Sequence, residues 1–179
     1  MADAKVRPAQ AEDVAEIARI QRDTWRTAYG SLLPAAVLDQ LTPELAEAQW
    51  AAAISRPPSP RHHVLVAMEG AWTVGFAACE PSPDEDADGH TGSIATLLVE
   101  PRWGRRGHGS RLLAAATDHL RVDALRTVTC WVYEEDRASA AFYASAGWEP
   151  SGLARVLDAD GHELREVQYH ADLGGPDSA

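Results

Sequence analysis

Apolar residues recur every three or four positions along the first third of the chain, as on one face of a helix. One such stripe consists of Val14, Ile17, Ala18, Gln21 and Trp25. It predicts a helix that continues towards Tyr29. A second helical stretch is predicted over residues 34–41. A third begins at Thr42 and Pro43, because a threonine hydroxyl caps free backbone amides and proline suits the first helical position.

Further along, apolar residues alternate with polar ones or form short continuous runs, which is typical of strands. Strands are predicted over residues 5–7, 64–68, 72–79, 94–99, 127–133, 152–157 and 163–172. Tight turns at residues 69–71 and 158–161 join two pairs of them into hairpins. A further helix is predicted over residues 137–146 and is closed by Gly147.

The most informative stretch is residues 94–120, in which a strand, a short loop and a helix follow one another. The apolar strand stops at Pro101, and the helical stripe after Ser110 consists of Leu112, Leu113, Ala116 and Leu120. Three glycines lie between them: Gly104, Gly107 and Gly109. Glycines let a ligand approach the main chain closely, and the free amides at a helix start attract anions. The stretch therefore predicts an anion-binding loop.

The charge distribution supports this prediction. The chain carries 27 acidic and 16 basic residues, for a net charge of −11, yet Arg102, Arg105, Arg106 and Arg111 fall within ten positions. The acidic balance argues against nucleic-acid or anionic-membrane partners. A solvated turn with incidental arginines is the alternative. Two common nucleotide motifs are excluded, since no lysine follows the glycines and their order is G-x-x-G-x-G.

This loop resembles that of the GNAT superfamily of acetyl-CoA-dependent N-acyltransferases, in which [Q/R]-x-x-G-x-[G/A] opens a helix. Gly107, His108 and Gly109 match, whereas Gly104 stands where the family has Gln or Arg. The amides of residues 105–110 need no particular side chains, and Arg105 or Arg106 could supply the missing charge.

A second motif resembles the same family. Residues 136–148 are similar to N-x-x-A-x-x-F-Y-x-x-x-G-[F/W], and Phe142, Tyr143, Gly147 and Trp148 all match. Asp136 replaces the usual asparagine, so it accepts hydrogen bonds from pantetheine but cannot donate one. The resemblance extends over about residues 5–173.

The resemblance implies an α/β (α+β) fold: a mixed, mainly antiparallel sheet with splayed central strands and helices on both faces. It also implies an N-acetyltransferase that moves the acetyl group of acetyl-CoA to a primary amine of a small molecule or peptide, without a metal. By the same resemblance, Tyr143 protonates the departing thiolate and a strand amide, that of Leu98 or a neighbour, stabilises the oxyanion. The residues expected to bind acetyl-CoA are Leu97, Leu98, Val99, Arg105, Arg106, Gly107, His108, Gly109, Ser110, Asp136, Ala138 and Tyr143.

The acceptor amine is expected to lie beside Trp25 and Tyr29, which project to one side of the first helix or simply pack in the core. Residues 80–92 hold five acids and form either a solvated loop or an acidic lip that attracts a cationic amine. The central strand lacks a carboxylate, so Glu80, Glu134, His90 or a water chain are the candidate bases.

The remaining features of the sequence indicate the domain organisation, the oligomeric state and the cellular location. We expect one domain over residues 4–173 with a flexible tail over 174–179, and a homodimer if the C-terminal strands pair. Neither an apolar leader nor a run of 18 apolar residues occurs, so a cytoplasmic protein is expected. Cys79 and Cys130 are expected as buried thiols. The alternative function is a binding module that holds coenzyme A without catalysis.

Overall fold

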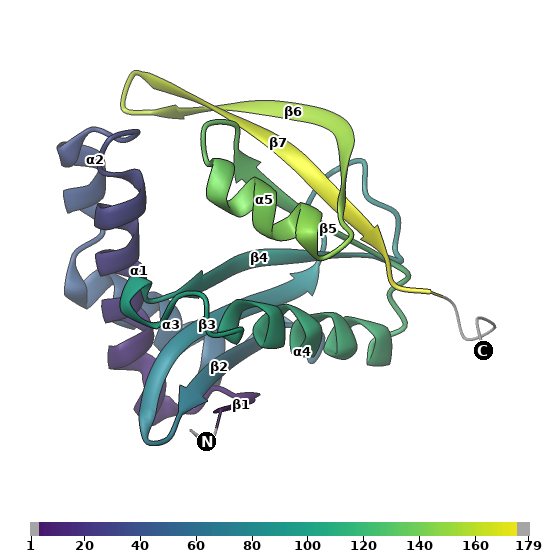
Figure 1. Cartoon of the computed structure of the whole chain (residues 1–179), viewed down its shortest axis with the longest axis horizontal. Coiled ribbons are helices and arrows are strands. Elements are labelled where there is room, and N and C mark those ends of the chain that lie inside the picture. Colours follow the sequence, from purple (N-terminus) through teal and green to yellow (C-terminus); the bar gives the residue numbers. More distant parts are fainter. Residues whose placement is uncertain (1–3, 175–179) are drawn as a thin grey trace.

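The computed structural model describes residues 4–174, and their strands form one seven-stranded sheet in the order β1-β2-β3-β4-β5-β7-β6 (Figure 1). The strands are β1 Ala4–Pro8, β2 His63–Glu69, β3 Trp72–Pro81, β4 Thr91–Val99, β5 Thr127–Tyr133, β6 Glu149–Ala159 and β7 His162–Asp172. Neighbouring strands are antiparallel except for β4 and β5, which are parallel. The predicted mixed, mainly antiparallel sheet is confirmed.

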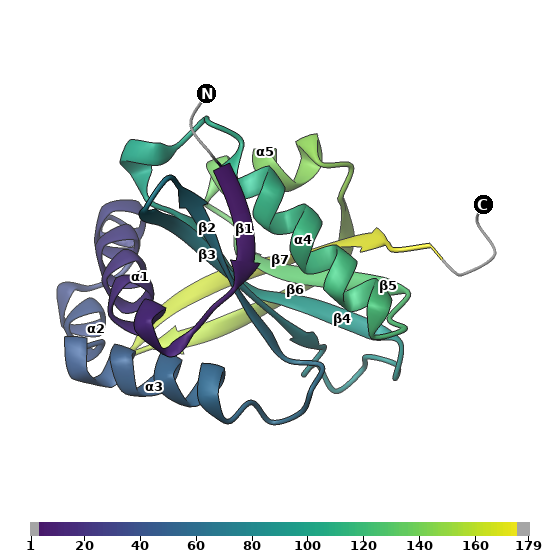
Figure 2. The ribbon, with the colours of Figure 1, turned by 90° about the horizontal axis from the view of Figure 1, so that it is seen from below.

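Helices cover both faces of this sheet (Figures 1 and 2). They are α1 Val14–Tyr29, α2 Ala35–Gln40, α3 Pro43–Ser55, α4 His108–Val122 and α5 Arg137–Ser145, with short 3-10 turns η1 Ala11–Asp13 and η2 Pro101–Trp103. Thr42 caps α3 as predicted, its hydroxyl accepting the Leu45 amide at 3.2 Å. The α1 and α3 helices lie on one face, and α4 and α5 on the other.

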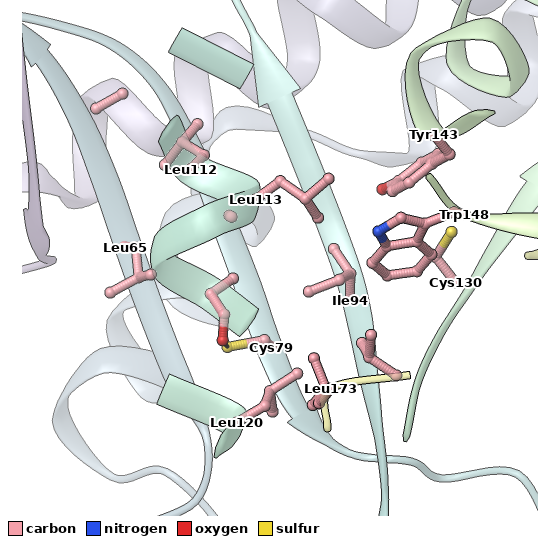
Figure 3. Packing of buried hydrophobic residues seen from close by; sticks show 14 of the residues in the cluster. Leu65, Cys79, Ile94, Leu112, Leu113, Leu120, Cys130, Tyr143, Trp148 and Leu173 are labelled. Atoms are coloured by element: carbon pink, nitrogen blue, oxygen red, sulfur yellow. Dashed lines mark hydrogen bonds between the residues drawn. The ribbon is translucent and has the colours of Figure 1, made fainter. Parts of the chain in front are cut away.

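Each face has its own apolar core. On one face, Ile17 and Ile20 of α1 and Trp50 of α3 pack on Phe76, with the Trp50 and Phe76 rings 4.9 Å apart. On the other, the α4 stripe predicted from sequence packs on the sheet, and Leu112 and Leu120 are fully buried (Figure 3). The two cores fix the sheet between its helices.

The parallel strands β4 and β5 separate soon after they meet. They pair only from Thr91 to Ser93 on β4, while β5 continues to Tyr133. A bulge accompanies the separation, since Ala78 and Cys79 of β3 face Thr96 and Ile94, which leaves Ala95 as the extra residue. The predicted splay of the central strands is therefore present, and it opens the sheet at its middle.

Three element starts differ from the predictions by two residues or more. The β4 strand begins at Thr91 instead of residue 94, and β6 at Glu149 instead of 152, because tertiary pairing recruits flanking residues. The α4 helix begins at His108, directly after Gly107, whose φ of 80° ends the loop abruptly. Of the predicted tail, residues 175–179 lie outside the described residues. Over residues 4–174, no helix is both long and apolar enough to span a membrane.

Candidate functional site

A cleft of about 210 Å³ lies where β4 and β5 separate. It brings together residues that are far apart in the sequence: Trp25 and Tyr29 of α1, Leu97 and Leu98 of β4, and Asp136 and Tyr143 at α5. All six were predicted from sequence as site residues. The cleft is therefore the meeting point of the expected acetyl-CoA and acceptor sides.

A second cavity of about 390 Å³ lies over the start of α4. Its walls include Val99, Arg105, Gly107, Gly109 and Ser110, together with Ala138 from α5. The first amides of α4 have no partners inside the helix, and no side chain caps them. Leu97, Ser139 and Phe142 line this cavity and the cleft alike. One groove therefore leads from the uncapped start of α4 to the gap between the strands.

The loop side chains point to different places. His108 is buried, and its Nε2 donates to Glu69 Oε2 at 2.7 Å. Arg106 donates to the other Glu69 oxygen at 2.9 Å and stacks on Trp103. These contacts lower the Glu69 pKa, chiefly through the His108 hydrogen bond. The side chains of His108 and Arg106 thus brace the loop against β2, and Arg105 is the loop arginine that lines the cavity.

Asp136 caps α5 with both of its carboxylate oxygens. Oδ1 accepts the Ser139 amide at 3.0 Å, and Oδ2 accepts the Ser139 hydroxyl at 2.7 Å and the Tyr29 hydroxyl at 3.3 Å. Asp136 therefore ties α1 to α5 across the cleft. The expected contact of Asp136 with pantetheine would compete with these partners.

Tyr143 is buried beside Trp148 and Cys130, with the Tyr143 and Trp148 ring centroids 5.0 Å apart (Figure 3). Burial, followed by the neighbouring Cys130, raises its pKa well above the usual value. Burial likewise raises the Cys130 pKa to about 12, so the adjacent thiol stays neutral. Cys130 and Cys79 are free and buried, as expected. The cleft thus holds a phenol that keeps its proton at neutral pH.

The cleft residues that were not predicted as site residues include Trp131 and Tyr133 on β5 and Glu166 on β7. Tyr133 meets Tyr29 edge to face at 4.9 Å. The signal was present in the alternation of β5, where Val128, Cys130 and Val132 are buried and the intervening residues face the other side. The sequence did not show that this second face borders the cleft.

The acidic segment is a surface loop that is anchored at one end. Asp84 accepts hydrogen bonds from Trp131 Nε1, at 3.1 and 3.2 Å, and from Gln168 Nε2 at 3.1 Å. Asp88 instead accepts from the His90 amide and the Thr91 hydroxyl within its own turn. A cavity of about 530 Å³ lies between the loop and the strands β5, β6 and β7, and it shares Trp131 with the cleft.

The candidate bases named from sequence lie away from the cleft. Glu80 faces His62 at 3.6 Å and lines another cavity beneath α3, which shares Ala95 and Thr96 with the cleft. Glu134 pairs with Arg165 at 3.2 Å on the surface, and His90 is exposed. Within residues 4–174, no cluster of three or more His, Cys, Asp or Glu side chains is arranged to hold a metal.

Comparison with solved structures shows the same fold in acetyltransferases. The PaiA N-acetyltransferase from Thermoplasma acidophilum, in complex with coenzyme A, superposes with a TM-score of 0.74 at 16% identity, over 95% of this chain and 99% of the other. The structure of yncA, a putative acetyltransferase from Salmonella typhimurium with its cofactor acetyl-CoA, superposes with a TM-score of 0.72. The identity is 20%, over 98% of this chain and 99% of the other.

Sequence comparison identifies relatives as well. The chain is 31% identical to the uncharacterized N-acetyltransferase YuaI of Bacillus subtilis over 175 residues, which cover 96% of this chain and 92% of that protein. It is 38% identical to the mycothiol acetyltransferase of Kineococcus radiotolerans over 84 residues, 47% of this chain and 26% of the other. The acetyltransferase (GNAT) family matches residues 14–148, which include the splayed strands, the helix start and Tyr143. The chain therefore belongs to the acetyltransferase (GNAT) family.

Proposed function

We propose that this protein transfers the acetyl group of acetyl-CoA to a primary amine of a small molecule or peptide in the cytoplasm. The observation that carries the proposal is the groove that runs from the start of α4 to the buried Tyr143. Its first part offers free amides and Arg105 to a pyrophosphate. Its second part offers the unpaired edge of β4 to a pantetheine arm. The catalytic unit spans residues 4–173.

The cleft supplies three contributions to aminolysis of a thioester. Side-by-side binding of the two substrates lowers the barrier by roughly 7 to 11 kcal/mol in favourable cases. The amide of Leu98 or a neighbour, freed where β4 leaves β5, donates to the developing oxyanion. Tyr143 is placed to protonate the leaving thiolate, because it lines the cleft and its phenol keeps its proton at neutral pH.

The acceptor enters from the side of α1 and β5, where Trp25, Tyr29, Trp131 and Tyr133 surround the cleft. Aromatic faces favour a cationic amine, and two carboxylates lie among them. The binding module without catalysis is the second candidate, and the engagement of both Asp136 oxygens with Ser139 and Tyr29 favours it.

Thiol release from acetyl-CoA, measured with a panel of amino-acid amides, short peptides, polyamines and alkylamines, tests the proposal. We expect amine-dependent release of coenzyme A together with the acetylated amine in the product mixture. Binding of acetyl-CoA without release for any amine would favour the binding module instead.

A further inference from the structure

Two carboxylates line the cleft, and they differ in what their oxygens already bind. Both oxygens of Asp136 accept hydrogen bonds from Ser139 or Tyr29. Glu166 on β7 is 7% exposed, and its Oε2 accepts Arg155 Nε at 2.6 Å. Among the described residues 4–174, no donor reaches Glu166 Oε1. Glu166 is therefore the cleft carboxylate with an oxygen available to a ligand.

We propose that Glu166 is the general base of this acetyl transfer and takes a proton from the acceptor's ammonium group through Oε1. The inference rests on the proposed function and adds the group that the central strand lacks. A general base must lie within hydrogen-bond reach of its proton, and Glu166 lines the same cleft as Leu98 and Tyr143.

Arg155 on β6 is the positioning residue for Glu166. Its Nε fixes Oε2, its guanidinium lies 4.3 Å from the Trp131 ring centroid, and its Nη1 is 3.8 Å from Asp84 Oδ1. Asp84 in turn accepts hydrogen bonds from the side chains of Trp131 and Gln168. The carboxylate is thus held from β6 and the acidic loop, and Oε1 is left for the acceptor.

The groups around Glu166 come from every element packed against it. Tyr133 on β5 and Tyr29 on α1 have pKa values raised chiefly by burial, so both phenols stay neutral. Arg155 carries the positive charge, and Asp136 and Asp84 are the neighbouring carboxylates. No histidine lines the cleft within the described chain. The proton acceptor is therefore a carboxylate rather than an imidazole.

Proton transfer to a glutamate is uphill in water, by about 4 pKa units from an α-amino group and about 6 from a lysine-like amine. In the cleft, the transfer converts a buried ammonium and carboxylate into two neutral groups, which burial favours, whereas the charge of the nearby Arg155 guanidinium opposes it. The pKa difference between amine and glutamate is smaller for the less basic α-amino group. We therefore expect α-amino groups to be better acceptors than alkylamines.

The ammonium N–H bond breaks and its proton moves to Glu166 Oε1, so the nitrogen lone pair can form the C–N bond to the thioester carbonyl. The C–S bond then breaks with its electron pair on sulfur, which takes the Tyr143 proton. A second nitrogen proton restores Tyr143, and Glu166 releases its proton to solvent. The products are an amide, coenzyme A thiol and one proton.

Ethylamine and 2,2,2-trifluoroethylamine test this assignment, because they are close in size but only ethylamine is protonated at pH 7. In the full-length protein, Glu166→Gln should lower kcat/KM for ethylamine by about 10²- to 10⁴-fold. For trifluoroethylamine it should leave kcat/KM near the parental value, since that amine needs no base. The KM for acetyl-CoA should not change.

Matched variants separate chemistry from structure. Glu134→Gln removes a second arginine-paired glutamate, which lies at the surface. It should leave kcat/KM unchanged for both amines. Glu166→Gln removes the nearest carboxylate partner of Arg155, which keeps Asp84 at 3.8 Å. The double variant Glu166→Gln/Arg155→Gln restores the charge balance of the pair, and it should recover the melting temperature but not ethylamine turnover. Arg155→Gln alone should lower kcat for ethylamine with the KM for acetyl-CoA unchanged.

Equal losses for both amines in Glu166→Gln, or parental ethylamine turnover, would overturn the assignment while the parent remains an active acetyltransferase. A parent that binds acetyl-CoA but releases no thiol with any amine would overturn the proposed function itself, and the base assignment with it.

Discussion

Tyr143 lies in the cleft and keeps its proton at neutral pH, as its proposed role of general acid requires. It is 7% exposed and lines the cleft, and burial keeps its pKa well above 10. The rings of Phe142 and Trp148 hold it on either side, at 5.2 and 5.0 Å between centroids. Its hydroxyl therefore stays protonated and fixed in place.

Tyr143→Phe keeps this ring packing and removes only the hydroxyl. We expect kcat to fall by roughly 10²- to 10⁴-fold, because the leaving thiolate loses its proton donor. Calorimetric binding of acetyl-CoA should stay near the parental value. Near-parental turnover of the folded variant, with a lower melting temperature, would instead mean that Tyr143 is only structural.

The start of α4 depends on glycine for close approach. A Cβ atom at Gly109 would lie 3.3 Å from Phe142 Cε2 and 3.8 Å from Val99 Cγ2, both of which line the groove. A side chain at position 109 therefore enters the space between α4, α5 and β4.

Coenzyme A should raise the melting temperature of the parent, since binding to the native state alone stabilises by about 2.7 kcal/mol at 100 Kd. Gly109→Val should abolish this increase by filling the groove. Gly89→Val is the control, because a Cβ there meets nothing within 4 Å. An unchanged ligand effect in Gly109→Val would exclude this helix start from the binding site.

The acidic loop divides into anchored and free carboxylates. Asp84 is bonded to Trp131 and Gln168, and Asp88 to its own turn, whereas Glu85 and Asp86 are exposed beside the cavity next to the cleft. Only the exposed pair can change the local potential without disturbing the loop.

The double variant Glu85→Gln/Asp86→Asn should raise the KM of a cationic acceptor a few fold and leave that of acetyl-CoA unchanged. The effect should disappear near 1 M salt, where the Debye length is about 3 Å. Steady-state kinetics at low and high salt measure it. Identical acceptor KM values at low salt would show that the loop is only a solvated connection.

Over the molecule as a whole, paired carboxylates control stability in acid. Burial raises the Asp13 pKa, but the hydrogen bonds from Arg7 and the Gln10 amide outweigh it, so the net pKa is lowered. Arg7 donates to both Asp13 oxygens, at 2.7 and 2.9 Å, and thereby ties β1 to the start of α1. A lowered carboxyl pKa stabilises the fold above the unfolded pKa of about 3.9, and this stabilisation is lost as the pH falls through the folded pKa.

Arg7→Gln should lower the free energy of unfolding by about 3 kcal/mol at pH 7, because the largely buried Asp13 loses its partner. The difference from the parent should shrink below about pH 4 as Asp13 becomes protonated. Urea unfolding at pH 7, 5 and 3 measures both the loss of stability at pH 7 and its decrease in acid. Arg26→Gln breaks an exposed pair and should cost less than about 1 kcal/mol; an equal cost for the two variants would contradict the argument.

The local elements could be predicted from the sequence because short-range patterns encode them. The stripe of α1, the cap at Thr42, the alternation of β5 and the glycines before α4 act through neighbouring residues, and their predicted elements are present. The two motifs also predicted the family, the splayed sheet and four of the residues that line the cleft, and the first helix supplied two more, Trp25 and Tyr29.

The tertiary structure alone decided what these elements face. Alternation in β5 and β7 shows that each strand has a polar face, but only the sheet order brings Trp131 and Glu166 to the cleft beside α1. Glu69 meets His108 across 39 residues, and Asp84 meets Gln168 across 84. The sequence by itself predicted the elements and the residues that we propose for the acetyl-CoA side of the site. Contacts at such separations depend on strand register and packing, which no local pattern specifies, so Trp131, Tyr133 and the available carboxylate of Glu166 became visible as cleft residues only in the folded chain.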